Sequence, residues 1–241
     1  MNKKDLTTFI SKYHLNGMIN KILLESKDDN LFCEFVSDTK SVIGKLAMSS
    51  LTFNNDCSMG IYDTASFLKI ISAIDEEFDV NVFTIEEEAK YIELKDSIKK
   101  AKYILSHPDI IPNPPKEIKL PSFDFEIEID DEFITNFIKS KNALSESTTF
   151  AFIEEAGKLK AVINYDKSNQ SVNTISFDVG DTIVNLDKEL NFQSDPFKEI
   201  LLANKVDFTT GNIKVSTKGL MEITFVGDNY QVTYYQVMLN N

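Results

Sequence analysis

The chain has 241 residues, a hydrophobic content of 42%, 18 Phe and a formal net charge of −13 at pH 7. This composition excludes a disordered or low-complexity chain, and the length suits either one large β domain or two domains of about 110 residues each. The acidic charge argues at first against a nucleic-acid partner, because phosphate binding normally needs a basic surface.

The first part of the chain predicts two helices and a set of antiparallel strands. Residues 5–15 place apolar side chains at helical spacing, with Asp5 positioned to cap the helix, and residues 62–74 do the same with Asp63 at the start. Between and after these segments, apolar and polar residues alternate and Gly, Asn or Asp mark turns, as in antiparallel sheet. The predicted strand regions here are residues 31–50, 78–85 and 89–105.

Five of the six prolines stand within residues 107–121, "HPDIIPNPPKEIKLP". Proline fixes φ, lacks a main-chain donor and biases the residue before it toward extended geometry, so this stretch can join neither a helix nor a central strand. We predict a semi-rigid connector over residues 107–121 between an N-terminal domain, 1–106, and a C-terminal domain, 122–241. A spacer with no function of its own is the alternative.

The second part of the chain repeats the order of elements found in the first. A helix is predicted over residues 130–144, and another over residues 194–206, where Asp195 and Pro196 form a start signal. Strands are predicted over residues 148–165, 173–181 and 208–238. The repeated order predicts an α+β fold with two similar domains of antiparallel sheet, each with two helices.

Lysines distinguish the predicted helices from the rest of this acidic chain. The windows 3–14, 62–74, 130–144 and 194–206 carry +2, 0, −1 and 0, so the remaining residues carry −14. Acids stand at the helix starts and lysines later, an order that macrodipole complementarity alone would explain. The other interpretation is a mildly basic helical surface that attracts a phosphate backbone without reading bases.

The sequence offers little to an enzyme. His14 and His107 are the only histidines, and neither a GxxxxGK[ST] loop nor a GxGxxG motif is present. Cys33 and Cys57 are too few for a cysteine-rich zinc site, and we expect both to be buried free thiols. We therefore predict no catalytic residue, no metal and no cofactor. A two-domain β-rich structural or adaptor protein remains as the alternative to a DNA-binding function.

No stretch of the chain is long and apolar enough to span a bilayer, and the first residues lack a continuous apolar signal core. We therefore expect a cytoplasmic protein.

Four stretches carry a resemblance to a known family through their order and spacing: "KDLTTFISKYHLNGMINKILL", "IYDTASFLKIISAIDEEFDV", "IIPNPPKEIKLP" and "LLANKVDFTTGNIKV". Together they resemble the sliding clamps of T-even-type tailed bacteriophages, which are processivity factors of the replicative DNA polymerase. The resemblance covers essentially the whole chain, and none of the stretches is a catalytic signature.

The resemblance implies a ring of three identical subunits with the DNA-clamp fold. In such a ring the sheets form the outer wall and the helices line a central hole for duplex DNA. It also implies three things about the cellular setting: the replicative DNA polymerase and an ATP-dependent clamp loader as partners, the cytoplasm of an infected host cell as the location, and a contribution to phage late transcription.

The resemblance also assigns site residues. Lys4 and Lys12 match lysines on the first helix of the family, and Lys139 and Lys141 fall in the basic end of its third helix. Three more lysines are assigned to the DNA-facing surface from their helix positions alone: Lys69, Lys198 and Lys205. Because the third helix opens with three acids, we expect weak, non-specific contacts suited to sliding.

The connector receives a role from the same resemblance. In clamps of this architecture it passes over an apolar groove that takes short C-terminal peptides of partner proteins, and Ile110, Ile111 and Pro112 would form the edge of that groove. A fixed, extended segment loses little entropy when a peptide docks beside it. Packing of the two isoleucines into a core is the competing interpretation.

Overall fold

The computed structural model describes residues 1–51, 53–115, 119–169, 171–181, 186 and 189–239. The chain divides into two compact units, Met1–Lys116 with Asn229–Val232 and Glu117–Asp228 with Thr233–Asn241. The division falls within the predicted connector, whose residues 116–118 lie outside the described residues. Residues 229–232, which we had predicted to belong to the C-terminal domain, group with the first unit.

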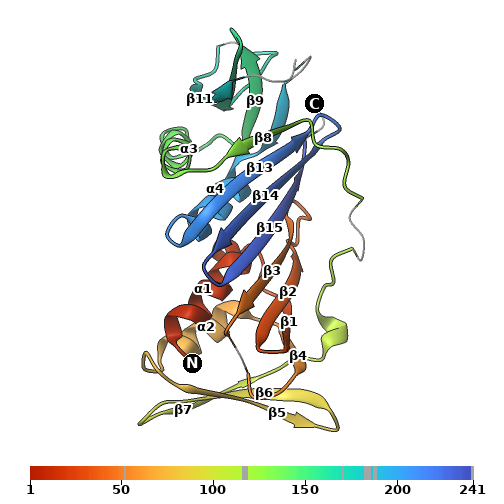
Figure 1. Ribbon diagram of the computed structural model, residues 1–241, viewed down its shortest axis with the longest axis vertical. Coiled ribbons are helices and arrows are strands. Elements are labelled where there is room, and N and C mark those ends of the chain that lie inside the picture. Colours follow the sequence, from red (N-terminus) through yellow and green to blue (C-terminus); the bar gives the residue numbers. More distant parts are fainter. Residues whose placement is uncertain (52, 116–118, 170, 182–185, 187–188, 240–241) are drawn as a thin grey trace. The chain divides into compact units, whose positions relative to one another are not determined.

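The first unit contains two helices and two antiparallel sheets (Figure 1). In one sheet the strands β4, β1, β2 and β3 are neighbours in that order, and the other sheet has the order β5-β6-β7. The helices are α1 (Lys3–His14) and α2 (Thr64–Ser72), with a 3₁₀ turn after α1 (Leu15–Gly17). The strands are β1 (Ile22–Lys27), β2 (Asn30–Val36), β3 (Ile43–Ser49), β4 (Cys57–Ile61), β5 (Asp79–Ile85), β6 (Glu88–Lys95) and β7 (Lys100–Ile104).

The apolar stripe of α1 closes the core of the first unit. Leu6, Phe9 and Ile10 are fully buried, and α1 lies beside α2 on one face of the β1–β4 sheet (Figure 1). The helix begins earlier than predicted, because the side chain of Asn2 accepts a hydrogen bond from Lys4 N at 2.8 Å. Asn2 is therefore the N-cap residue, and the prediction that Asp5 caps this helix was wrong.

The second unit has the same kinds of elements. In one sheet the strands β15, β14, β13 and β8 are neighbours in that order, and the other sheet has the order β11-β10-β9-β12. The helices are α3 (Asp131–Ala143) and α4 (Ser194–Asn204). The strands are β8 (Phe125–Glu128), β9 (Thr149–Glu155), β10 (Lys158–Ile163), β11 (Ile175–Asp181), β12 (Leu190–Gln193), β13 (Phe208–Ser216), β14 (Leu220–Gly227) and β15 (Tyr230–Val237), of which residues 230–232 group with the first unit.

Aromatic packing fixes the helices of the second unit. The ring of Phe137 on α3 meets the rings of Phe150 and Phe197 edge to face, at centroid distances of 5.0 and 4.6 Å. Such pairs contribute about 0.5–1.5 kcal/mol each beyond the area they bury. Both helices are thereby held against β9, and their polar faces are left to solvent.

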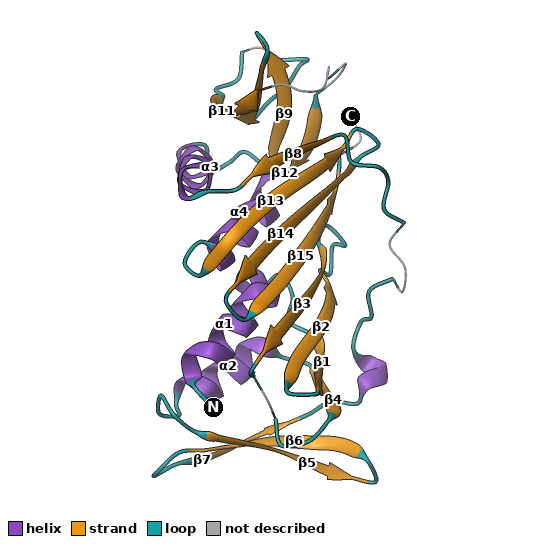
Figure 2. Cartoon of the chain, in the orientation of Figure 1, coloured by secondary structure: helices purple, strands orange, loops and turns teal. Residues whose placement is uncertain are grey.

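The first unit follows the order helix, strands, helix, strands, and the second unit follows the same order after an initial strand, β8. Figure 2 shows strands as most of each unit. The predicted α+β fold of two similar domains is confirmed. Four short strands, β1, β4, β8 and β12, were not predicted, and the connector contains one 3₁₀ turn (Pro108–Ile110) where we expected no helical turn. Proline at the first position of that turn fits, because its missing N–H has no partner there in any case.

Candidate nucleic-acid interface

The seven lysines predicted to face DNA do not share one environment. Five of them reach solvent: Lys4, Lys69, Lys139 and Lys205 are exposed and Lys198 is half-buried. Lys12 and Lys141 are 1% and 3% exposed. The prediction that these two lysines face DNA was therefore wrong, since a buried ammonium group cannot reach a phosphate.

Lys12 is buried because of its place on α1. It lies three residues after Phe9, which puts it at the margin of the apolar stripe. Its Nζ stands 4.3 Å from the centroid of the Tyr230 ring, and Tyr230 belongs to the same unit. A cation over the face of an aromatic ring is attracted by the quadrupole of the ring, so Lys12 stabilises the fold.

Lys141 is buried for the corresponding reason. It lies four residues after Phe137 and so on the buried face of α3. Its Nζ donates a hydrogen bond to the main-chain oxygen of Ser145 at 2.7 Å and pairs with Asp195 Oδ1 at 2.8 Å. Because Asp195 stands in the first turn of α4, this lysine ties the end of α3 to the start of α4.

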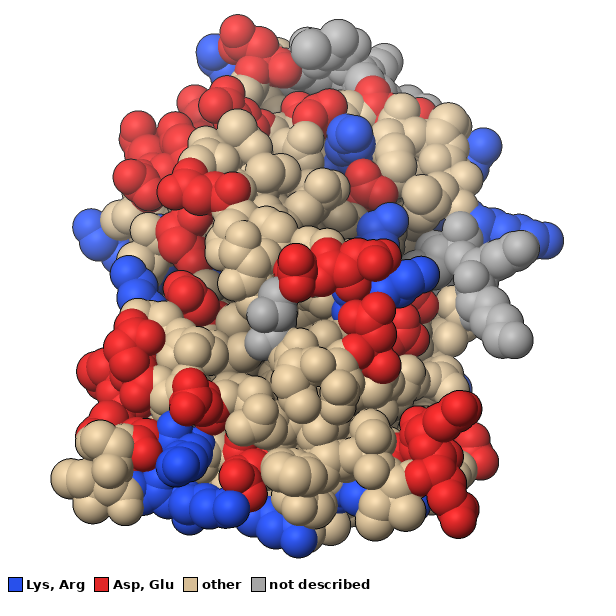
Figure 3. Space-filling model, turned by 60° about the horizontal axis from the view of Figure 1, so that its bottom comes forward, with Lys and Arg blue, Asp and Glu red and all other residues tan. Residues whose placement is uncertain are grey.

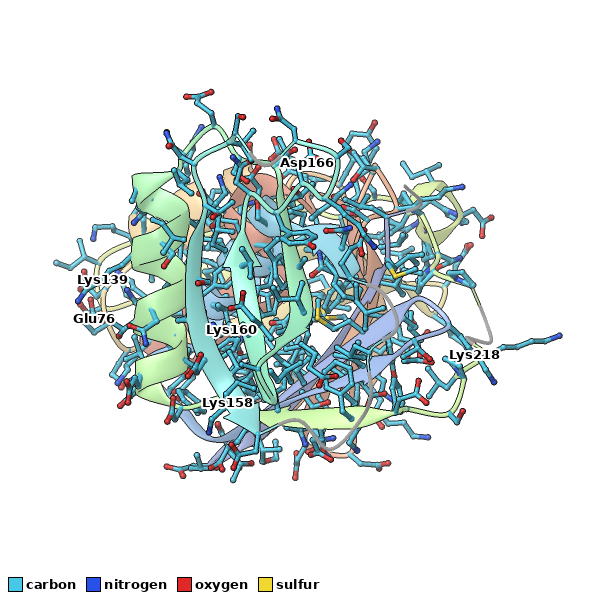
Figure 4. All side chains as sticks on the ribbon, turned by 90° about the horizontal axis from the view of Figure 1, so that it is seen from above. Glu76, Lys139, Lys158, Lys160, Asp166 and Lys218 are labelled. Carbon is cyan, nitrogen blue, oxygen red and sulfur yellow. The ribbon has the colours of Figure 1, made fainter. Side chains whose placement is uncertain are left out.

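The exposed lysines lie on the solvent faces of the helices. Lys139 extends from the side of α3 that faces away from the strands (Figure 4). Lys4 is in the first turn of α1 and Lys69 is in the last turn of α2. Each unit thus presents ammonium groups that can meet a phosphate backbone without reading its sequence.

The acids at the helix starts have a structural role. Asp63 accepts a hydrogen bond from Ser66 N at 3.0 Å, and Asp130 accepts one from Phe133 N at 2.7 Å. Hydrogen bonds from Ser66, chiefly from its hydroxyl, hold the pKa of Asp63 below its ordinary value. These acids are N-caps, which agrees with the macrodipole interpretation for the acids and leaves the exposed lysines to be explained.

Lys205 differs from the other exposed lysines because it lines a groove together with Glu126 and Glu128 of β8. Acidic and basic side chains are also interspersed over the face shown in Figure 3. Lys205 therefore lies among acids, which weakens its attraction for a phosphate backbone.

The three connector residues predicted to form the edge of a peptide groove also differ in burial. Ile111 is 3% exposed and packs near Gly60 of β4, whereas Ile110 is 56% exposed and Pro112 is exposed. Ser106 N donates to Gly60 O at 2.8 Å, which fastens the start of the connector to β4. Core packing is therefore the role of Ile111, and Ile110 and Pro112 remain accessible to another chain.

The residues that the structure describes give little support to a function based on a metal ion or a reactive thiol. They contain no group of three or more His, Cys, Asp or Glu side chains arranged to hold a metal ion. Cys33 is buried, as expected, and burial raises the pKa of its thiol, whereas Cys57 is only half-buried. No described helix is long and apolar enough to cross a membrane.

Comparisons with known proteins agree with the architecture. No family model matches the chain, and no curated protein matches it in sequence. Solved structures match over nearly its whole length. In a structure of A. fulgidus PCNA with the C-terminal region of FEN-1 bound, one chain aligns with a TM-score of 0.74 and 16% identity, covering 100% of this chain and 97% of that one.

Two further structures give the same result. The PCNA2–PCNA3 complex from Sulfolobus tokodaii matches with a TM-score of 0.72 and 13% identity, covering 99% of this chain and 97% of that one. Proliferating Cellular Nuclear Antigen from Entamoeba histolytica matches with a TM-score of 0.69 and 14% identity, covering 99% and 94%. The chain has the sliding-clamp fold. At these identities the likeness shows the fold alone.

Among the described residues, six strands of this clamp fold pair with a single neighbouring strand: β4, β5, β7, β8, β11 and β12. Three of these edge strands, β7, β8 and β11, carry clear charge differences, which were visible in the sequence. β7 carries Lys100 and Lys102, β8 carries Glu126 and Glu128, and β11 ends in Asp181. Open sheet edges can pair with another chain, so these strands are candidate contact sites.

Proposed function

We propose that the protein is a sliding clamp, in which three copies close a ring around duplex DNA and tether the replicative DNA polymerase. The observation that carries the proposal is the two-unit clamp fold, matched over the full chain at a TM-score of 0.74. The exposed helix lysines of both units support it, because a sliding ring needs only weak, non-specific attraction to phosphates.

The finer parts of the proposal rest on the resemblance of the sequence to T-even-type phage clamps. They are a phage origin, action in the cytoplasm of the infected host, loading by an ATP-dependent clamp loader and a contribution to late transcription. We also propose that the protein is not an enzyme and acts by topology and binding, without a cofactor.

Open strand edges supply a way to join the copies. Leu105 N donates to Lys90 O at 3.0 Å, and hydrogen-bonded pairs alternate along an antiparallel ladder. The main-chain groups of Lys100, Lys102 and Ile104 therefore point away from β6, toward an added strand. In the proposed ring, β7 of one copy lies beside the more acidic edge strand β11 of the next, a head-to-tail contact that closes.

The first experiment is light scattering on the purified protein over a dilution series, followed by retention on DNA. We expect a mass of three times 27.4 kDa at the upper concentrations. After loading, the protein should stay on closed circular DNA and leave linear DNA through its ends. A monomer at every concentration, released equally from both DNA forms, would refute the clamp.

A DNA-independent adaptor is the second candidate. It is favoured by the net charge of −13 and by the burial of two of the seven predicted DNA-facing lysines. The same DNA experiment separates the two functions, because an adaptor gains no retention when the ends of the DNA are closed.

A further inference from the structure

A groove of about 790 Å³ lies within the second unit and has no role in the clamp function proposed above. Its walls come from β8, the first residues of β13, the start of α3, and the two residues Lys205 and Val206 that follow α4. Glu126 and Glu128 line one side, and Val206 and Phe208 line another. The groove therefore combines an acidic wall with an apolar surface.

The acidic wall is also an open sheet edge. β8 pairs only with β13, where Glu128 lies opposite Asn212, and Ile129 N donates to Gly211 O at 2.8 Å. Because hydrogen-bonded pairs alternate in an antiparallel ladder, the main-chain groups of Glu126 and Glu128 point away from β13. Their N–H and C=O groups can therefore pair with a further strand.

Charged side chains on an edge often serve only to prevent pairing with other chains. Two observations indicate that this edge also binds a ligand. Val206 is 83% exposed beside this edge, and solvent-exposed apolar surface is not needed to block an edge. Asn212 Nδ2 donates to Glu126 Oε1 at 2.7 Å, which holds this carboxylate in one orientation.

The charge of the groove selects its occupant. Glu126, Glu128, Asp130 and Asp131 line it, and Lys205 is the single lysine among the lining residues that the structure describes. Asp130 is already used as the cap of α3, so the two glutamates of β8 and Asp131 are the acids left for a ligand. A phosphate backbone is repelled here, whereas a basic peptide is attracted.

We propose that β8 and this groove bind an extended, basic segment of a partner protein as an added strand. Lysine or arginine at alternate positions of the segment pairs with Glu126 and Glu128, and a neighbouring apolar side chain packs on Val206. Strand addition supplies affinity through main-chain hydrogen bonds, and the side chains supply specificity.

The test uses the full-length protein and the peptide acetyl-Lys-Val-Lys-Val-Lys-amide, followed by NMR and by titration at two salt concentrations. We expect shifts in residues 125–128 and 205–212, and binding that weakens with salt. The same peptide with glutamate in place of lysine should not bind. Equal binding of both peptides, or shifts spread over the whole surface, would overturn the proposal.

Variants make the test specific to the groove. Glu126→Lys with Glu128→Lys should weaken binding by about tenfold or more, since attraction becomes repulsion. Lys205→Ala should strengthen it about two- to fivefold by removing a competing cation. The matched control is Glu25→Lys with Glu34→Lys, which changes the net charge equally at exposed positions of β1 and β2. Loss of binding in the control would mean non-specific attraction and would refute the groove.

Two further measurements separate strand addition from its rivals. N-methylation of the alternate peptide amides that face β8 should abolish binding, and N-methylation of the other set should not; equal effects would refute main-chain pairing.

The variant Glu126→Lys with Glu128→Lys should also keep the solution mass of the unsubstituted protein. If its copies separate, the groove binds a second copy of the chain, and the partner-protein proposal fails even though the ring proposal stands.

Discussion

At the scale of single residues, the two buried lysines show how helical spacing decides between fold and function. Lys141 lies four residues after Phe137, so it follows the buried face of α3, while Lys139 two residues earlier lies on the exposed face. Charge order along the sequence does not distinguish them, whereas their angle from the aromatic stripe does. The burial of Lys141 could have been predicted from that angle alone.

This difference leads to a prediction about stability. Lys141→Met should lower the free energy of unfolding by about 1–3 kcal/mol, because it removes a charged donor from Ser145 O and Asp195. Lys139→Met is the matched control and should change it by less than about 0.5 kcal/mol. Urea denaturation measures both. Equal effects of the two substitutions would contradict the assigned structural role of Lys141.

Gly60 gives a second prediction at this scale. A Cβ atom there would stand 2.3 Å from Ser106 O and 3.1 Å from Ser106 C, both main-chain atoms that no side-chain rotation can move. Gly60→Ala should therefore destabilise the protein by about 1–3 kcal/mol and loosen the start of the connector. Ser106→Ala, which leaves the main chain unchanged, is the control. A Gly60→Ala variant with an unchanged urea midpoint would show that β4 and the connector are not held this closely.

At the scale of elements, long periodic segments were predictable and short strands were not. The four helices lie within the predicted windows or extend two residues beyond them, because each carries an apolar stripe of three turns or so. β8 and β12 have four residues each, too few for alternation to appear above chance. They form because a neighbouring strand supplies hydrogen bonds, which is a property of the tertiary structure.

The β6–β7 turn gives a prediction on pH. Asp96 accepts hydrogen bonds from Lys99 N at 2.5 Å, Ile98 N at 2.8 Å and Asp75 N at 2.9 Å. These donors, Lys99 first, lower the pKa of Asp96 from 3.8 to about 2. Because the pKa of Asp96 is lower in the folded state than in the unfolded state, its ionised carboxylate stabilises the protein at pH values above the unfolded pKa of about 4. This stabilisation disappears as pH falls from about 4 to about 2.

Asp96→Asn should therefore flatten the dependence of the urea midpoint on pH in this window. The substitution removes the titrating carboxylate and keeps one acceptor oxygen. Asp38→Asn, an exposed change of the same charge away from the turn, is the control. An unchanged slope between pH 4 and pH 2 in Asp96→Asn would show that Asp96 does not link the turn to pH.

At the scale of the whole molecule, repetition was the informative property of the sequence. The predicted order of helix, strands, helix and strands occurs twice, once on each side of the connector. This repetition predicted two similar domains, and the clamp fold confirms them. The candidate site was predicted less well, since burial depends on what each helix packs against. The open edges of β7, β8 and β11 could not be predicted, because strand order follows from the fold and not from local pattern.

The last prediction concerns DNA contact by the assembled protein. Lys4→Glu with Lys139→Glu changes one exposed helix lysine in each unit, and neither residue is buried as Lys12 and Lys141 are. The variant should fold and assemble normally, yet be retained about tenfold or more weakly on circular DNA, with a smaller salt dependence, because fewer counterions are released. Lys45→Glu with Lys218→Glu makes the same charge change at exposed positions outside the helices and should leave retention much closer to that of the unsubstituted protein. If both double variants lose retention equally, net charge governs DNA binding, and the helices have no special place in it.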